Sequence, residues 1–144
     1  MNRLLKTLKK DGLQGFIPQK TGQVEKSEKN KRKSVTEFFK SIESFDDSAI
    51  YAIDVTKKFK KSVKLCYSRN LDLELLENII YTLAQGKQLD SKHFPHPLKG
   101  FKSRLNEKVM ECHIQPDWLL VWIQNDTELI LLFTNTGTHS DIFG

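Results

Sequence analysis

The sequence predicts an α+β domain in which a helical hairpin covers a mostly antiparallel sheet of four strands. A short β-prone run at residues 50–54 comes first, two amphipathic helical patterns follow, and three further β-rich runs come last. Because helices and most strands are grouped rather than alternating, the order β-α-α-β-β-β is typical of an α+β fold. A length of 144 residues suits one ordinary domain with an extension.

Two helices form the predicted hairpin. Apolar residues recur at helical spacing through residues 55–66, and a second such pattern covers residues 72–85 with Asp72 as its N-cap. The polar break at residues 68–70 is short, so the two helices should pack antiparallel and cover the sheet together. The outward face of the first helix is basic and carries Lys57, Lys60, Lys61 and Lys64. This face either keeps the domain soluble or contacts the phosphates of a nucleic acid.

The remaining strands are expected in the last third of the chain. Residues 108–114, 118–124 and 128–134 are β-rich, and short polar connections at 115–117 and 125–127 join them. Connections of this length predict an antiparallel meander. The second and third of these strands are apolar on both faces, which predicts that they lie in the centre of the sheet.

Residues 1–49 are predicted to be a basic extension that is partly disordered, and residues 50–144 the folded domain. The extension carries 11 Lys and Arg against 7 Asp and Glu, whereas the remainder carries 12 against 11. Residues 19–33 have too few apolar side chains to offset the entropy of ordering, so we expect a linker there. Short helices are expected on either side, near residues 4–8 and 34–44.

Composition narrows the possible partners and the compartment. The net charge of +5 favours polyanionic partners. The two cysteines, Cys66 and Cys112, are too few for a disulfide framework or a four-thiolate metal site, so reduced thiols in a cytoplasmic protein are expected. No secretion signal and no apolar run long enough to span a membrane is visible, so no membrane partner is predicted.

Three short blocks near the end of the chain carry residues suited to catalysis. They are His-Pro-Leu-Lys-Gly at 96–100, Cys-His-Ile-Gln-Pro-Asp-Trp at 112–118 and Thr-Gly-Thr-His-Ser-Asp-Ile-Phe-Gly at 136–144. Three of the four histidines lie in these blocks. Because the imidazole titrates near neutral pH, histidines that converge from different strand ends can serve as an acid and a base.

RNA cleavage is a reaction that needs only such groups. The 2′-OH of RNA supplies the nucleophile, so the protein must provide a base, an acid, and donors or cations for the phosphorane. Neither a metal ion nor a cofactor is required. A zinc site built on His93 and His96 is disfavoured because Pro95 and Pro97 prevent a helical histidine pair. Ser140 lies in no nucleophile elbow, so a serine hydrolase is also disfavoured.

The three blocks, together with the order of the elements, resemble the YafQ branch of the RelE toxin superfamily over about residues 50–144. The resemblance implies the toxin of a type II toxin–antitoxin pair. Members of that branch enter the ribosomal A site and cut mRNA there, without a cofactor. The partners it implies are the ribosome, mRNA, and a cognate antitoxin that blocks the active site.

The resemblance also implies a set of catalytic residues, namely His96, His113, Asp117 and His139. We expect His139 and Asp117 to transfer protons, and His113 to orient them or share that work. His96 is expected near the scissile phosphate or an adjacent base. Which group is the acid and which is the base stays open.

Four further residues are predicted to bind the substrate: Lys99, Trp118, Asn135 and Phe143. Trp118 and Phe143 match aromatic positions of the family and could stack on nucleobases. Trp118 could equally be a core residue of its strand. Lys99 could contribute charge at a phosphate. Asn135 stands where the family commonly has an arginine, so the transition state would have one cation fewer.

Asn135 and the segment at residues 34–44 each leave an alternative open. Asn135 raises the possibility of a catalytically attenuated relative that binds antitoxin, ribosome or RNA without cutting. The amphipathic pattern at residues 34–44 could form a built-in cover that acts like an antitoxin, or it could belong to an extension without structure.

Overall fold

The computed structural model describes residues 32–45, 48–100 and 104–144. The expected helix near residues 4–8 and nearly all of the expected linker over 19–33 lie outside the described residues. The helices are α2 (Val35–Glu43), α3 (Lys57–Ser68), α4 (Leu73–Ala84), the 3₁₀ helix η1 (Ser91–His93) and α5 (His139–Phe143). The strands are β2 (Ala52–Val55), β3 (His96–Pro97), β4 (Glu107–Gln115), β5 (Trp118–Asn125) and β6 (Ile130–Gly137).

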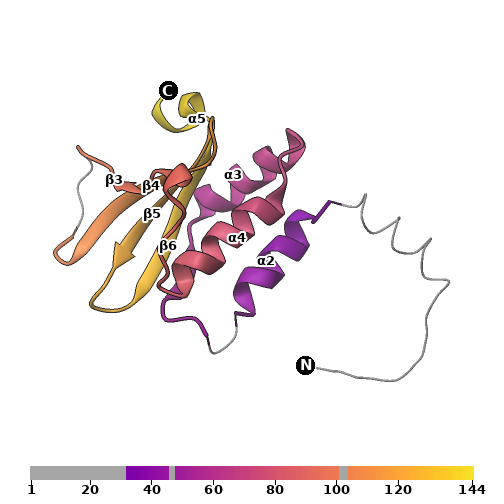
Figure 1. Ribbon diagram of the computed structural model, residues 1–144. Coiled ribbons are helices and arrows are strands. Elements are labelled where there is room, and N and C mark those ends of the chain that lie inside the picture. The colour runs from indigo at the N-terminus through magenta and orange to yellow at the C-terminus, as the bar shows by residue number, and fades with distance from the viewer. Residues whose placement is uncertain (1–31, 46–47, 101–103) are drawn as a thin grey trace, which may run out of the picture. The chain divides into compact units, whose positions relative to one another are not determined.

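The strands form one mixed sheet in the order β2-β6-β5-β4-β3. β2 runs parallel to β6, and all other neighbours are antiparallel, so the expected α+β fold is confirmed (Figure 1). The expected number of four strands is wrong, because the two residues His96 and Pro97 add a fifth strand at the edge. A strand of two residues shows no alternating pattern in the sequence, so it could not be predicted.

The predicted hairpin of α3 and α4 is present, and side-chain caps begin both helices. Thr56 Oγ1 accepts a hydrogen bond from the backbone N–H of Phe59 at the start of α3. Asp72 caps α4 as expected, through Oδ1 and the N–H of Glu74. None of the helices in the described ranges is long and apolar enough to cross a membrane.

The hydrophobic core lies between this hairpin and one face of the sheet. The largest fully buried side chains in it are Phe59, Leu73, Leu76, Ile80, Trp118, Leu120, Trp122, Leu131 and Phe133. Both cysteines are buried there as well. Burial raises the pKa of Cys66 to about 11 and that of Cys112 to about 12, so both thiols are protonated at neutral pH.

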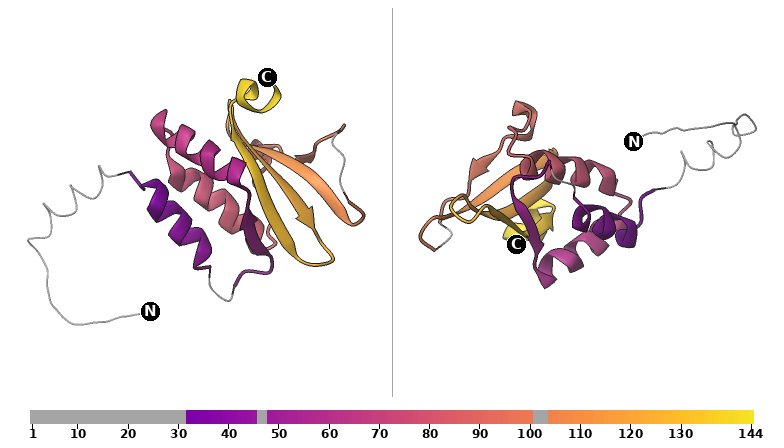
Figure 2. Two further views of the ribbon diagram at one scale, coloured as in Figure 1. Left: turned by 180° about the vertical axis from the view of Figure 1, so that it is seen from behind. Right: turned by 90° about the horizontal axis from the view of Figure 1, so that it is seen from below.

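Helix α2 adds a third layer on the other side of the hairpin. Phe38 and Ile42 are buried against α4 and α3, and both views place the hairpin between α2 and the sheet (Figures 1 and 2). A capping box of Ser34 and Glu37 begins the helix, and Lys33 pairs with Glu77 of α4. The compact unit therefore begins at Lys33, upstream of the boundary near residue 49 that composition suggests.

Candidate active site

Three of the four predicted catalytic residues meet at one end of the sheet. His113 and Asp117 flank the turn between β4 and β5, and His139 begins α5 directly after β6. The pairing of His113 with Leu119, and of Leu119 with Gly137, brings these strand ends side by side. The ring centroids of His113 and His139 are 5.8 Å apart.

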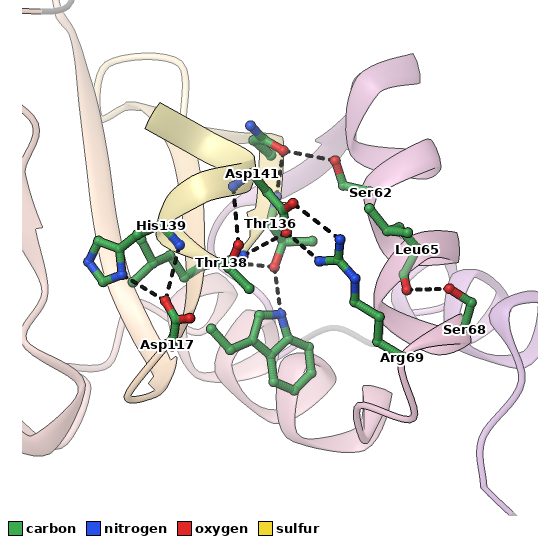
Figure 3. Close-up of polar contacts among 12 residues, drawn as sticks. Ser62, Leu65, Ser68, Arg69, Asp117, Thr136, Thr138, His139 and Asp141 are labelled. Atoms are coloured by element: carbon green, nitrogen blue, oxygen red, sulfur yellow. Dashed lines mark hydrogen bonds and ion pairs between the residues drawn. The ribbon is translucent and has the colours of Figure 1, made fainter. Parts of the chain in front are cut away.

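Asp117 holds His139 by two hydrogen bonds. Its Oδ1 accepts from the backbone N–H of His139 at 3.1 Å and from Nδ1 of the ring at 2.8 Å (Figure 3). The hydrogen bond from the ring is the main reason why the pKa of Asp117 lies below its usual value. Because an ionised carboxylate can only accept, Nδ1 carries the hydrogen and Nε2 of His139 is left for other chemistry.

The ring of His113, like that of His139, is held through a hydrogen bond at Nδ1. Its Nδ1 donates to the backbone oxygen of Pro116 at 3.1 Å, which leaves Nε2 for the substrate. The backbone oxygen of His113 accepts a hydrogen bond of 2.6 Å from Nδ1 of His93. His93, for which the sequence indicates no special role, thus ties the segment before β3 to the end of β4.

His96 differs from these two histidines because both of its ring nitrogens are engaged. Nδ1 donates to the backbone oxygen of Phe94 at 2.6 Å, and Nε2 lies 3.1 Å from Oε1 of Glu111. Glu111 pairs with His96 across β3 and β4 and is only 5% exposed. Its Oε2 is buried and accepts no hydrogen bond from the described part of the chain.

Glu111 is the site residue that the sequence interpretation missed. It lies two residues before His113 in a strand, so both side chains project from the same face of the sheet. That alternation was available as a signal. The burial of the carboxylate and its pairing with His96 depend on β3, which the sequence does not reveal.

Helix α5 aims His139, and its first turn is closely packed. Thr138 and Asp141 form a capping box, and Asp141 also pairs at 2.6 Å with Arg69, the C-cap residue of α3 (Figure 3). A Cβ at Gly137 would lie 2.6 Å from Oδ2 of Asp141, so only glycine fits the approach to this turn. The link to Arg69 therefore connects the histidine-bearing end of the sheet to the helical hairpin.

This link should make the stability of the α5 attachment depend on pH. The Arg69 guanidinium is the main cause that holds the pKa of Asp141 below its usual value. A lowered pKa in the folded state adds stability above the unfolded pKa, and that stability is lost as the pH falls through the folded value. We expect Asp141→Asn to lower stability at pH 7 by about 0.2 to 1 kcal/mol, the range for an accessible ion pair, because it removes the charge that pairs with Arg69. Urea unfolding at several pH values should show the difference shrinking below about pH 4; a constant difference would contradict it.

The residues predicted to bind substrate have different environments. Phe143 is half exposed, with its ring centroid 6.2 Å from that of His139. Lys99 is exposed and follows β3 by two residues. Trp118 is 2% exposed, and its Nε1 donates to Oγ1 of Thr136 inside the core. The expected stacking of Trp118 on RNA is therefore corrected to a core role, because neither face of the ring is accessible.

Asn135 is also largely buried, at 8% exposure. Its Oδ1 accepts from Oγ of Ser62 at 2.8 Å and from the N–H of Thr136 at 2.9 Å. It pairs with Val121, which pairs with Glu111 on the other side, so all three lie in one row across the sheet. The amide is thus tied to α3 and carries no charge into that row.

The fold and the site define a small α+β protein with two accessible histidines at one end of its sheet, and comparison with known proteins identifies its class. Residues 51–144 match the family described as the bacterial toxin of type II toxin–antitoxin systems, YafQ. The chain belongs to this family, so the resemblance seen in the sequence is confirmed and the protein is a toxin of that class.

Individual relatives agree with this assignment. The mRNA interferase toxin YafQ of Escherichia coli strain B is 31% identical over 97 residues, which cover 64% of this chain and 95% of the relative. The E. coli DinJ–YafQ toxin–antitoxin complex contains a chain with 30% identity and a TM-score of 0.58, covering 66% of this chain and 99% of that one. A metal-bound toxin from Helicobacter pylori is 36% identical with a TM-score of 0.58, over 63% and 97% of the two chains.

Proposed function

We propose that this toxin cleaves mRNA through the 2′-OH of the RNA, with His113 and His139 as the proton-transfer pair. One observation carries the proposal: the two rings lie 5.8 Å apart, and a fixed acceptor holds Nδ1 of each so that both Nε2 atoms are available. Such a pair can place one nitrogen at the attacking oxygen and the other at the leaving oxygen of one phosphate.

The reaction balances with these two groups. One imidazole takes the proton of the 2′-OH while the 2′-oxygen forms a bond to phosphorus. The bond from phosphorus to the 5′-oxygen breaks, and the other imidazole, in its protonated form, gives that oxygen a proton. The products are a 2′,3′-cyclic phosphate and a free 5′-OH.

Asp117 and the pair of His96 and Glu111 serve this proton transfer indirectly. Asp117 is ionised and engaged with His139, so we assign it to fixing the tautomer and stabilising the imidazolium rather than to proton transfer itself. The pair lies on the same face as His113, but both nitrogens of His96 are engaged, so we assign the pair to holding β3 against β4 beside His113 rather than to proton transfer.

The relatives support the substrate and the partners. Proteins about 30% identical to this chain are named mRNA interferase toxins, and one related toxin has been solved in complex with the antitoxin DinJ. We propose a cognate antitoxin for this chain and action on mRNA at the ribosome in the cytoplasm. The exposed lysines along α3 suit contact with ribosomal RNA.

The test is expression in growing bacterial cells with mapping of new mRNA 5′ ends, repeated with purified ribosomes and mRNA. We expect cuts within translated reading frames, cuts that require the ribosome, and protection when the neighbouring antitoxin gene is expressed. New 5′ ends that are identical with and without the toxin would refute cleavage. Equal cleavage of naked mRNA would refute dependence on the ribosome.

A catalytically attenuated toxin is the second candidate, and Asn135 is the observation that favours it. The amide is neutral, buried, and engaged with Ser62, so it supplies no cation to the row that contains Glu111. In this form the protein would still bind antitoxin, ribosome or RNA without cutting.

Asn135→Arg distinguishes the two candidates. An arginine at this position can extend across Val121 toward the phosphate and should raise single-turnover cleavage at least tenfold, since one preorganised donor can be worth roughly 10² to 10³. The matched control is Asn135→Gln, which lengthens the side chain without charge and should not raise the rate. Unchanged cleavage by a folded arginine variant would show that the missing cation does not limit activity.

A further inference from the structure

An exposed phenylalanine, Phe94, lies beside His113, as Phe143 lies beside His139. We propose that Phe94, with the groove next to it, binds a base of the substrate RNA adjacent to the cleaved bond and so helps determine which sequences are cut. This proposal rests on the proposed cleavage of RNA. It assigns Phe94 as a residue for substrate positioning and specificity.

Four rings form a row across the end of the sheet. Phe94 and His113 have centroids 6.0 Å apart with an interplanar angle of 73°, and His113 and His139 follow at 5.8 Å. Phe143 completes the row at 6.2 Å from His139. Phe94 is 67% exposed and Phe143 is 50% exposed. The two phenylalanines thus flank the histidines, and a single strand whose phosphate lies between the histidines can place one base on each ring.

The backbone holds the ring of Phe94 outward at a cost in strain. Phe94 has φ 46° and ψ 53°, in the left-handed region that bulky residues avoid, and Pro95 follows it. The same residue accepts the hydrogen bond from Nδ1 of His96 through its backbone oxygen. Core packing does not account for this conformation because the ring is exposed, whereas strained residues recur where a ligand binds.

The groove beside the ring has the composition of a site for a nucleobase. It has a volume of about 810 Å³ and lies between α4, η1 and the turn from β4 to β5. His113 lines it, so it is continuous with the candidate active site. Its other contributors are His93, the apolar Leu75, Ile79, Ile114 and Pro116, the amides of Asn78 and Gln115, and the cation of Lys92.

Each of these groups matches a part of a nucleotide. The apolar side chains and the Phe94 ring can cover the faces of a base, and an amide can pair with its edge. Lys92 can neutralise the neighbouring phosphate. RNA is favoured over a peptide as the occupant of the groove, because a cation and two amides surround an aromatic ring beside the reacting histidines.

The test uses RNA that binds but cannot react. A fluorescein-labelled 2′-O-methyl octanucleotide spanning the mapped cleavage site lacks the nucleophile, and its binding is followed by anisotropy. A second set of octanucleotides carries an abasic residue at one position at a time. Should no cleavage site be mapped, mixed-sequence octanucleotides take their place. The proteins compared are the parent, Phe94→Ala, Phe94→Trp, and Leu105→Ala, whose side chain is 88% exposed at the opposite end of β4.

We expect Phe94→Ala to weaken binding of the intact octanucleotide roughly 5- to 100-fold, the range for one stacked base. Phe94→Trp should restore binding, and Leu105→Ala should bind as the parent does. For the parent, an abasic residue next to the cleaved bond should weaken binding by a similar factor. For Phe94→Ala, the same abasic residue should leave binding almost unchanged, since the two changes remove the same contact. Among cleaved mRNAs, Phe94→Ala should also lose the parental preference at that position.

Three results would overturn the assignment. They are a parent that binds no octanucleotide, a folded Phe94→Ala that binds all of them as the parent does, and an abasic penalty that persists unchanged without the ring. Weaker binding of the antitoxin alone, with RNA binding intact, would assign Phe94 to the protein interface instead. If the parent binds RNA through Phe94 yet cuts no mRNA, the proposed cleavage fails while the base site stands.

Discussion

His139→Ala is expected to slow single-turnover cleavage of ribosome-bound mRNA by at least a hundredfold. The substitution removes the ring whose Nδ1 is held by Asp117 and whose Nε2 is thereby left for proton transfer. General acid–base catalysis is worth roughly 10² to 10⁴, and losing either proton transfer loses that factor. Cleavage is measured with enzyme in excess, so that release of the product does not mask the chemical step.

The structure offers a neighbouring control for this variant. Ser140→Ala changes the next residue of α5, whose side chain is exposed, and should cut at the parental rate. Because His139 is more than half exposed, its loss should leave the unfolding midpoint nearly unchanged. A folded His139→Ala that cuts as fast as the parent would remove His139 from the mechanism.

Phe38→Ala is expected to destabilise the protein by about 3 to 5 kcal/mol, the usual cost of removing a buried phenylalanine side chain. Phe38 is fully buried in the core cluster, and its ring lies edge to face with that of Phe39, 5.0 Å away. Since domains are typically stable by only 5 to 15 kcal/mol, this loss is a large share of the total. Urea unfolding with a two-state fit gives the measurement.

Thr36→Ala on the exposed side of the same helix is the matched control and should change stability by less than about 0.5 kcal/mol. The comparison tests whether α2 is part of the folded domain, although the family match begins only at residue 51. If Phe38→Ala unfolds with the parental midpoint, α2 is not docked on α4 in solution. In the structure α2 packs on α4 and α3, on the side of the hairpin away from the sheet, so the expectation that this helix covers the active site is wrong for the docked helix.

The order of the elements follows from local patterns in the sequence. Helical spacing and the N-cap Asp72 predict α4, and strand propensities with short polar connections predict β4 to β6. Each of these signals lies within about a dozen neighbouring residues. The three histidine-containing blocks likewise predict the family from residue type and spacing alone.

Contacts between distant residues are what the sequence left open. By residue type Trp118 is equally suited to stacking and to the core, and its burial, together with the hydrogen bond to Thr136 across the sheet, decides for the core. The sequence identifies Asn135 as an uncharged residue at a position where the family has a cation. It does not predict the hydrogen bond that Asn135 accepts from Ser62 of α3. Asp117 accepts a hydrogen bond from His139 that lowers the pKa of the carboxyl and fixes the tautomer of the ring, and no spacing rule predicts such a bond.

The sequence by itself determined the class of fold, the family, and the short list of residues able to move protons, because each of these depends on residue type and local spacing. Only the tertiary structure decided that Glu111 pairs with His96 and that α2 completes the core. It also decided that an exposed Phe94 lies beside His113. These features depend on burial and on the pairing of strands far apart in the chain, where the free energy of a contact is set by its surroundings rather than by its neighbours in sequence.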